Sequence, residues 1–160
     1  MDERNVSSAG YSAVDVIEMA MRIEEKGSSF YRTAAEKSGM NVVKDLFVRL
    51  ADKEDEHKKV FAGILSKLPG NRSEKNLTLP SDVETYLRSV ADKAVFFDPE
   101  STNEQFFENA ALSDVFSAAM EMEKDSILFY SGLLNLLESE KDKEPVFRII
   151  REEKGHLEEL

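Results

Sequence analysis

The amino-acid sequence predicts an all-α protein built as a four-helix bundle. Four segments carry apolar residues at helical spacing, and none alternates apolar and polar residues with the period of two that is typical of a strand. Short loops join the first segment to the second and the third to the fourth, whereas a long connector separates these two halves. Because short loops join antiparallel neighbours, each half is expected to be a helical hairpin.

The composition limits the kind of partner and the kind of site. The chain has 160 residues, enough for a single domain, and no cysteine, which excludes disulfides, thiolate metal sites and a catalytic thiol. A net charge of -11 at pH 7 disfavours binding to nucleic acid or to anionic lipid. The first residues do not resemble a secretory signal, and no apolar stretch approaches the roughly 20 residues that cross a bilayer. We therefore expect a cytoplasmic protein.

The first two helices are predicted over residues 12–37 and 41–68, joined through Ser38-Gly39-Met40-Asn41. Residues 1–10 are expected to be a flexible tail. The second helix has the clearest pattern, because its core positions advance alternately by four and three residues and so form one continuous stripe. These positions are Val43, Phe47, Leu50, Glu54, His57, Phe61, Ile64 and Leu68.

The last two helices are predicted over residues 110–138 and 144–158, where Pro145 suits a first helical turn. Residues 69–109 form a long crossover connector that begins with Pro69-Gly70 and contains a predicted extra helix over residues 83–96. Two phenylalanine pairs are expected to pack this connector against the bundle: Phe96-Phe97 and Phe106-Phe107. The whole chain, residues 1–160, is thus predicted to be one domain.

The two halves form an internal repeat in which equivalent residues lie 99 positions apart. Each half contains a glutamate, a second glutamate 30 residues later and a histidine three residues after that. The matched pairs are Glu24 with Glu123, Glu54 with Glu153, and His57 with His156. Two related hairpins that face each other would place these six residues around a pseudo-twofold axis.

The six residues are predicted to point into the core. Glu24 lies seven residues from both Ile17 and Tyr31, and seven residues turn a helix to within about 20° of two full turns. Glu24 therefore lies on the apolar stripe of its helix. The other five polar residues lie on the stripes of their helices in the same way: Glu54, His57, Glu123, Glu153 and His156.

Four carboxylates in one core require compensation, because burial and mutual repulsion both disfavour their charged forms. Two divalent cations would balance the four charges and leave the histidines neutral. A glutamate and a histidine three residues apart share one helix face, so each pair can give one metal an imidazole while its carboxylate bridges or chelates. One glutamate from each of two helices and Glu-x-x-His from each of the other two is the ligand pattern of di-iron and di-manganese bundles. For either half alone, a core histidine paired with its neighbouring acid remains the alternative.

The residues around these ligands resemble the rubrerythrin-like ferritin superfamily, in a short form without a rubredoxin domain. The stretch from Ala20 to Tyr31 resembles the ligand motif of the first helix, and Phe47 to His57 resembles that of the second. The stretch from Glu123 to Tyr130 is similar to the third helix of short members. The resemblance implies a ferritin-like four-helix bundle with a long crossover.

The resemblance also implies a function and a cofactor. It implies two iron ions in a non-haem centre that reduces hydrogen peroxide, or less readily oxygen, in oxidative-stress defence. Full-length members have a cysteine-rich domain and a further glutamate ligand, but this chain has no cysteine and carries Ser126 one turn after Glu123. An external electron donor such as a rubredoxin-like protein is therefore expected, together with a homodimer. No catalytic residue is expected beyond the metal ligands.

Two tyrosines lie two turns from the glutamate ligands on the same helix faces. The hydroxyls of Tyr31 and Tyr130 can hydrogen-bond a ligand carboxylate from another helix and hold it in place. Packing of these rings in the core with an incidental hydroxyl partner is the alternative.

Other functions remain open for the same ligand set. The centre would oxidise iron for storage or sequestration if the chain formed a closed shell of many subunits. A metal that only holds the bundle together is a second alternative. Two manganese ions with catalase-like chemistry, or a mixed pair of metals, are also compatible with this ligand set, because oxygen and imidazole ligands suit both iron and manganese.

Overall fold

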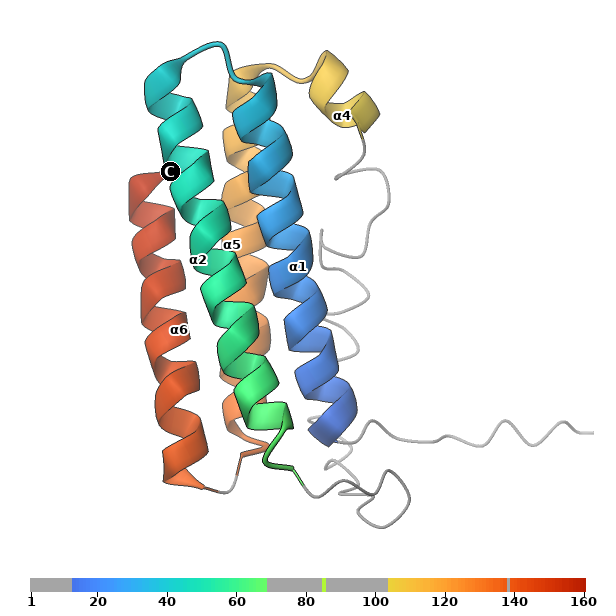
Figure 1. Cartoon of the computed structure of the whole chain (residues 1–160), viewed down its shortest axis with the longest axis vertical. Coiled ribbons are helices and arrows are strands. Elements are labelled where there is room, and N and C mark those ends of the chain that lie inside the picture. Colours follow the sequence, from blue (N-terminus) through green and yellow to red (C-terminus); the bar gives the residue numbers. More distant parts are fainter. Residues whose placement is uncertain (1–12, 69–84, 86–103, 138) are drawn as a thin grey trace, which may run out of the picture.

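The four long helices of the structure, a computed structural model, form an antiparallel bundle (Figure 1). The structure describes residues 13–68, 85, 104–137 and 139–160, and this part of the chain contains helices and no strand. In chain order the helices are α1 (Ala13–Lys37), α2 (Asn41–Leu65), α4 (Glu104–Asn109), α5 (Leu112–Leu134) and α6 (Glu140–Glu159).

The topology is that of two helical hairpins joined by a crossover (Figure 1). Helix α1 is antiparallel to α2, and α5 is antiparallel to α6. Helix α5 begins at the end of the bundle opposite to that at which α2 ends, so these two helices run parallel. The all-α four-helix bundle predicted from the sequence is confirmed. Among the helices of the described residues, none is long and apolar enough to span a membrane.

The observed helix ends correct several predicted boundaries. Helix α2 ends at Leu65 rather than at residue 68, and α5 is shorter at both ends than the predicted segment. Helix α6 begins at Glu140, so Pro145 lies in its second turn and not in its first. The predicted tail (residues 1–10) and, except for the helical Thr85, the predicted helix over residues 83–96 lie outside the described residues.

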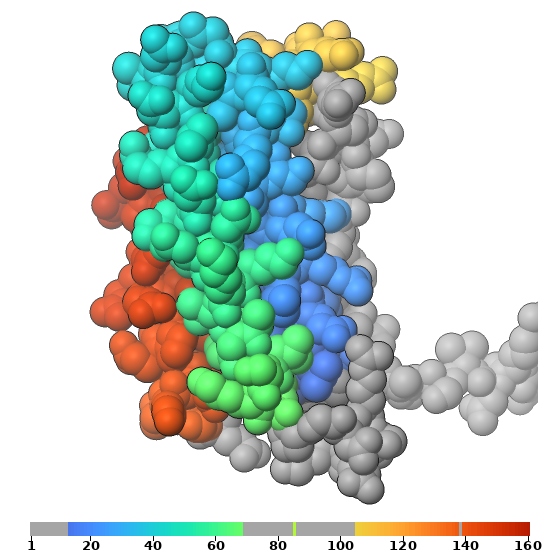
Figure 2. All heavy atoms as spheres, viewed as in Figure 1, coloured from blue at the N-terminus to red at the C-terminus, as the bar shows by residue number. Residues whose placement is uncertain are grey.

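The core is filled by large apolar side chains from all four long helices. Phe47 and Tyr31 stack with ring centroids 5.8 Å apart, and Phe61 lies 4.9 Å from Tyr130. Other side chains with almost no exposure are Ile17, Ile23, Phe30, Leu50, Met122, Phe129 and Leu133. In the space-filling view α2 lies across the front of the bundle, with α1 on one side and α6 on the other (Figure 2).

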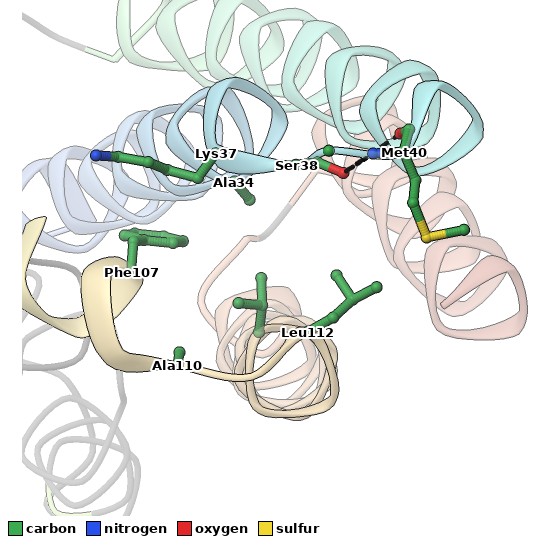
Figure 3. A pocket seen from close by; sticks show the side chains of 9 residues that line it. Ala34, Lys37, Ser38, Met40, Phe107, Ala110 and Leu112 are labelled. Carbon is green, nitrogen blue, oxygen red and sulfur yellow. Dashed lines mark hydrogen bonds between the residues drawn. The ribbon is translucent and has the colours of Figure 1, made fainter.

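Helix α4 is a short element that the sequence pattern did not predict. It packs on the end of the bundle through Phe107, which is buried and has its ring 5.1 Å from that of Phe30. The expectation that the Phe106-Phe107 pair packs against the bundle is thus confirmed for Phe107. The other pair, Phe96-Phe97, lies outside the described residues. A cavity of about 150 Å³ remains between α4, the start of α5 and the loop between α1 and α2 (Figure 3).

Candidate metal centre

The six polar residues predicted as metal ligands meet in the middle of the bundle. Each has at most 5% of its surface exposed, although all six carry groups that normally face water. The four long helices all contribute, with Glu24 from α1 and Glu123 from α5. Helices α2 and α6 each contribute a Glu-x-x-His pair: Glu54 with His57, and Glu153 with His156.

The donor atoms fall into two overlapping groups, each the size of a metal site. One group contains Glu24, Glu54, His57 and Glu153, and the other contains Glu54, Glu123, Glu153 and His156. Within each group the donor atoms lie within 4.8 Å of one another. Since both groups include Glu54 and Glu153, these two carboxylates are placed to bridge a pair of ions. Glu24 and Glu123 each belong to one group and are placed to bind one ion.

Glu153 lies between the two histidines of the centre. One of its oxygens lies 3.1 Å from Nδ1 of His57, and the other lies 2.9 Å from Nδ1 of His156. The two imidazoles are nearly parallel, with ring centroids 5.8 Å apart. Both histidines therefore present the same nitrogen to the carboxylates, on opposite sides of Glu153.

The residues present fit a pair of bound cations. Six buried atoms in the centre have no hydrogen-bond partner: Oε2 of Glu24, Oε1 of Glu54, both carboxylate oxygens of Glu153, and Nδ1 of His57 and of His156. An unsatisfied buried polar atom costs about 1–3 kcal/mol, so six in one place would be a large penalty in a protein that is stable by about 5–15 kcal/mol. Metal coordination would satisfy all six. Carboxylate oxygens with imidazole nitrogens suit iron, manganese and zinc, and exclude a site selective for soft metals.

Burial and mutual repulsion strongly shift the pKa values of the acid groups of the centre. Burial raises the pKa of Glu24 and of Glu54 well above their ordinary value, and the charge of Glu153 adds to this effect. The same causes raise the pKa of Glu123 to about 8. Glu153 is the exception: burial opposes its ionisation, but the close approach of the His156 and His57 rings outweighs burial and lowers its pKa.

The histidine shifts complete the charge balance of the metal-free centre. Burial alone would lower both histidine pKa values, but the adjacent carboxylate of Glu153 raises the pKa of His57 to about 9. The adjacent carboxylates of Glu123 and Glu153 raise the pKa of His156 to about 10. Without metal, protons on these side chains therefore supply the positive charge. Cations that bind here must displace those protons.

Two tyrosines cross the bundle to hold the outer carboxylates. The hydroxyl of Tyr31 on α1 donates to Glu123 on α5, and the hydroxyl of Tyr130 on α5 donates to Glu24 on α1. Burial is the main cause that raises the pKa of both phenols, and the charges of the nearby carboxylates add to it. Both tyrosines therefore remain protonated donors. Each tyrosine thus fixes a ligand from the other half of the repeat, which is the arrangement that the sequence suggested.

Two further residues contribute to the centre, although the sequence did not point to them. Oε2 of Glu152, on the turn that carries Glu153, lies 3.1 Å from Nε2 of His57 and so orients its ring. Gly27 faces Glu54, and a Cβ at this position would lie 3.1 Å from its Oε2. By contrast Ser126, 99 residues after Gly27, donates its hydroxyl to the carbonyl of Met122 on its own helix at 3.1 Å.

Replacing Gly27 by alanine is expected to weaken metal binding by about tenfold while leaving the fold intact, because the added methyl displaces the Glu54 carboxylate by a few tenths of an ångström. Alanine also favours a helix interior over glycine by about 1 kcal/mol, so the metal-free protein should be no less stable. Calorimetric titration with Co²⁺ and thermal melting measure the two effects. Gly39→Ala is the control, because a Cβ there meets no atom within 4 Å. Unchanged metal affinity in the Gly27 variant would contradict the close approach to Glu54.

Comparisons with known proteins agree with this geometry. The family model described as rubrerythrin matches residues 15–160. A crystal structure from Thermotoga maritima, described provisionally as a ferritin-like diiron-carboxylate protein, superposes with a TM-score of 0.70 and 26% sequence identity. The match covers 94% of this chain and 92% of that one. No curated protein matches. With the family model covering nearly the whole chain and the carboxylate-histidine cluster at its centre, this protein belongs to the rubrerythrin family.

Proposed function

We propose that the protein binds two iron ions on the six buried residues and reduces hydrogen peroxide to water. The observation that carries this proposal is the pair of donor groups that share Glu54 and Glu153, whose buried carboxylate oxygens are free to bind cations. Two adjacent iron ions, when bound, supply the two electrons that the reaction needs: one peroxide, two protons and two electrons give two water molecules. Iron is proposed over manganese because the similar structure is described as a diiron protein.

The side chains of the chain would have three tasks in this reaction. Glu54 and Glu153 hold the ions close together, and Tyr31 and Tyr130 keep Glu123 and Glu24 in position through their hydroxyl protons. Phe47 and Phe61 pack on these two tyrosines and, with the other buried apolar residues, exclude bulk water from the core. Because the negative carboxylates outnumber the neutral histidines, the centre stabilises the more oxidised, more positive state of the ions.

The electrons must come from another molecule, since the chain has no cysteine with which to hold an iron-sulfur or rubredoxin-type centre. A small electron-transfer protein of the rubredoxin type is the proposed donor. A cytoplasmic homodimer is proposed as the working form, and its mass in solution is directly measurable by light scattering.

The test is anaerobic reconstitution with two equivalents of Fe²⁺, followed by mixing with hydrogen peroxide in a stopped-flow spectrometer. The expected result is oxidation of two iron ions per peroxide, faster than for free Fe²⁺ at the same concentration, and slower with oxygen. A rate no greater than that of free Fe²⁺ would leave the metal a structural role. Preferential oxidation by oxygen with accumulation of ferric iron beyond two ions per chain would instead identify an iron-storage protein.

A further inference from the structure

A cavity between α2 and α6 borders one side of the metal centre. Its volume is about 280 Å³, which gives room for several water molecules. Residues from both helices line it, among them Arg49 and Lys53 on α2, and Glu152, Gly155 and His156 on α6. One of the predicted metal ligands, His156, therefore forms part of its wall.

His156 is the least covered of the six ligands. It is 5% exposed, whereas Glu24 and Glu153 are fully buried and His57 is 2% exposed. Its Nδ1 lies 2.9 Å from Glu153 inside the centre and has no hydrogen-bond partner. The imidazole thus forms the wall between the cavity and the carboxylates, and a small molecule in the cavity is one side chain away from them.

The two halves of the repeat differ in how their histidines are covered. At His57, the equivalent position in the other half, Glu152 covers the outer ring nitrogen at 3.1 Å and is itself 3.7 Å from Arg148. The residue 99 positions before Glu152 is Lys53, which turns to Glu56 at 2.8 Å instead of covering His156. The residue 99 positions after Glu56 is Gly155, whose missing side chain leaves the space empty. Two differences between the halves of the repeat, Lys53 against Glu152 and Glu56 against Gly155, therefore leave His57 covered and His156 open to the cavity.

We propose that this cavity is the route by which small oxygen- or nitrogen-donor ligands, of the size of peroxide or azide, reach the metals, and that Gly155 keeps it open. The proposal rests on metal binding by the six residues, but not on peroxide reduction. The charges at the opening suit such ligands, because each acidic side chain there has a basic partner: Glu159 has Arg49, Glu56 has Lys53, and Glu152 has Arg148. The opening is thus close to neutral in a chain of net charge -11, and it does not repel a neutral or singly anionic molecule.

The test is azide binding to the Co²⁺-loaded protein, followed by stopped-flow absorbance. Gly155→Phe is expected to slow both association and dissociation at least about tenfold, equivalent to roughly 1.4 kcal/mol of added barrier, with Kd changed less than about twofold. A residue on the route changes both rates equally, because the bound ligand is the same. Gly63→Phe is the matched control, since Gly63 is also a half-buried helical glycine whose Cβ would meet no atom within 4 Å.

Each other outcome overturns the proposal. Unchanged rates in Gly155→Phe would show that ligands enter elsewhere, and a weaker Kd with unchanged association would show that Gly155 touches the bound ligand. If Gly155→Phe does not fold, Lys53→Trp narrows the cavity from the opposite wall at a half-exposed position, and the same rates must fall. Failure of Co²⁺ to bind would remove the metal site altogether. Absence of peroxide reduction would leave the azide result unaffected, because azide binds without electron transfer.

Discussion

Replacing Glu153 by glutamine is expected to abolish binding of the metal pair. The two oxygens of Glu153 reach one histidine each, at 3.1 Å and 2.9 Å, and the residue belongs to both donor groups. Glutamine has the same size, but it loses the negative charge and presents a single acceptor. Both ions would lose a donor at once, and three carboxylates are too few to neutralise two divalent cations. The expected stoichiometry falls from two ions per chain to fewer than one.

Metal analysis after gel filtration measures this stoichiometry, and Co²⁺ titration measures the affinity. The control is Glu158→Gln, which makes the same chemical change at an exposed position of the same helix. Circular dichroism of both variants separates lost binding from lost fold. A Glu153 variant that still holds two ions would contradict the bridging role of this carboxylate. Retention of one ion would show that Glu54 alone is enough to complete one site.

The fold was predictable because its main signal is periodic. In α2 the positions from Val43 to Ile64 that were expected to face the core are all buried. Helix ends were less predictable, since helical and non-helical conformations compete in the terminal turns. Pro145 suggested a helix start near residue 144, but the preceding turn continues from Glu140, and the backbone bonds from Asp142 and Lys143 to Ser139 close it. Helix α4 has six residues, too few to show a period.

The burial of the six candidate ligands was predictable for the same reason, because sequence spacing placed each of them on a core stripe. Which carboxylates belong to both donor groups was not predictable from the spacing. The role of Glu152 depends on the distance between α2 and α6, because its partner His57 is 95 residues away. The role of Gly27 depends on how closely helix α1 approaches Glu54. The sequence did contain one signal for Glu152: at its position the two halves of the repeat differ, with Lys53 in the first half and Glu152 in the second.

The stability of the metal-free protein is expected to fall steadily from pH 5.5 to pH 9. A group whose pKa is raised by folding contributes stability below its unfolded pKa, and this contribution is lost as the pH rises toward the folded value. Glu123 loses its contribution between its ordinary pKa of 4.5 and about 8. His57 and His156 lose theirs between 6.5 and about 9 and 10. Glu153, with a lowered pKa, acts in the opposite direction only in acid, below about pH 4.5.

Metal should remove this dependence, because bound cations replace the protons as the positive charge of the centre. The loaded protein is therefore expected to keep its melting temperature from pH 5.5 to 9, so that the stabilisation by metal grows with pH. Thermal melts with chelator and with preloaded Co²⁺ at pH 5.5, 7 and 9 measure the difference. Both histidines of the chain lie in the centre and there is no cysteine, so surface side chains contribute little in this range. A metal-free protein that becomes more stable toward pH 9 would mean that protons do not hold this centre together.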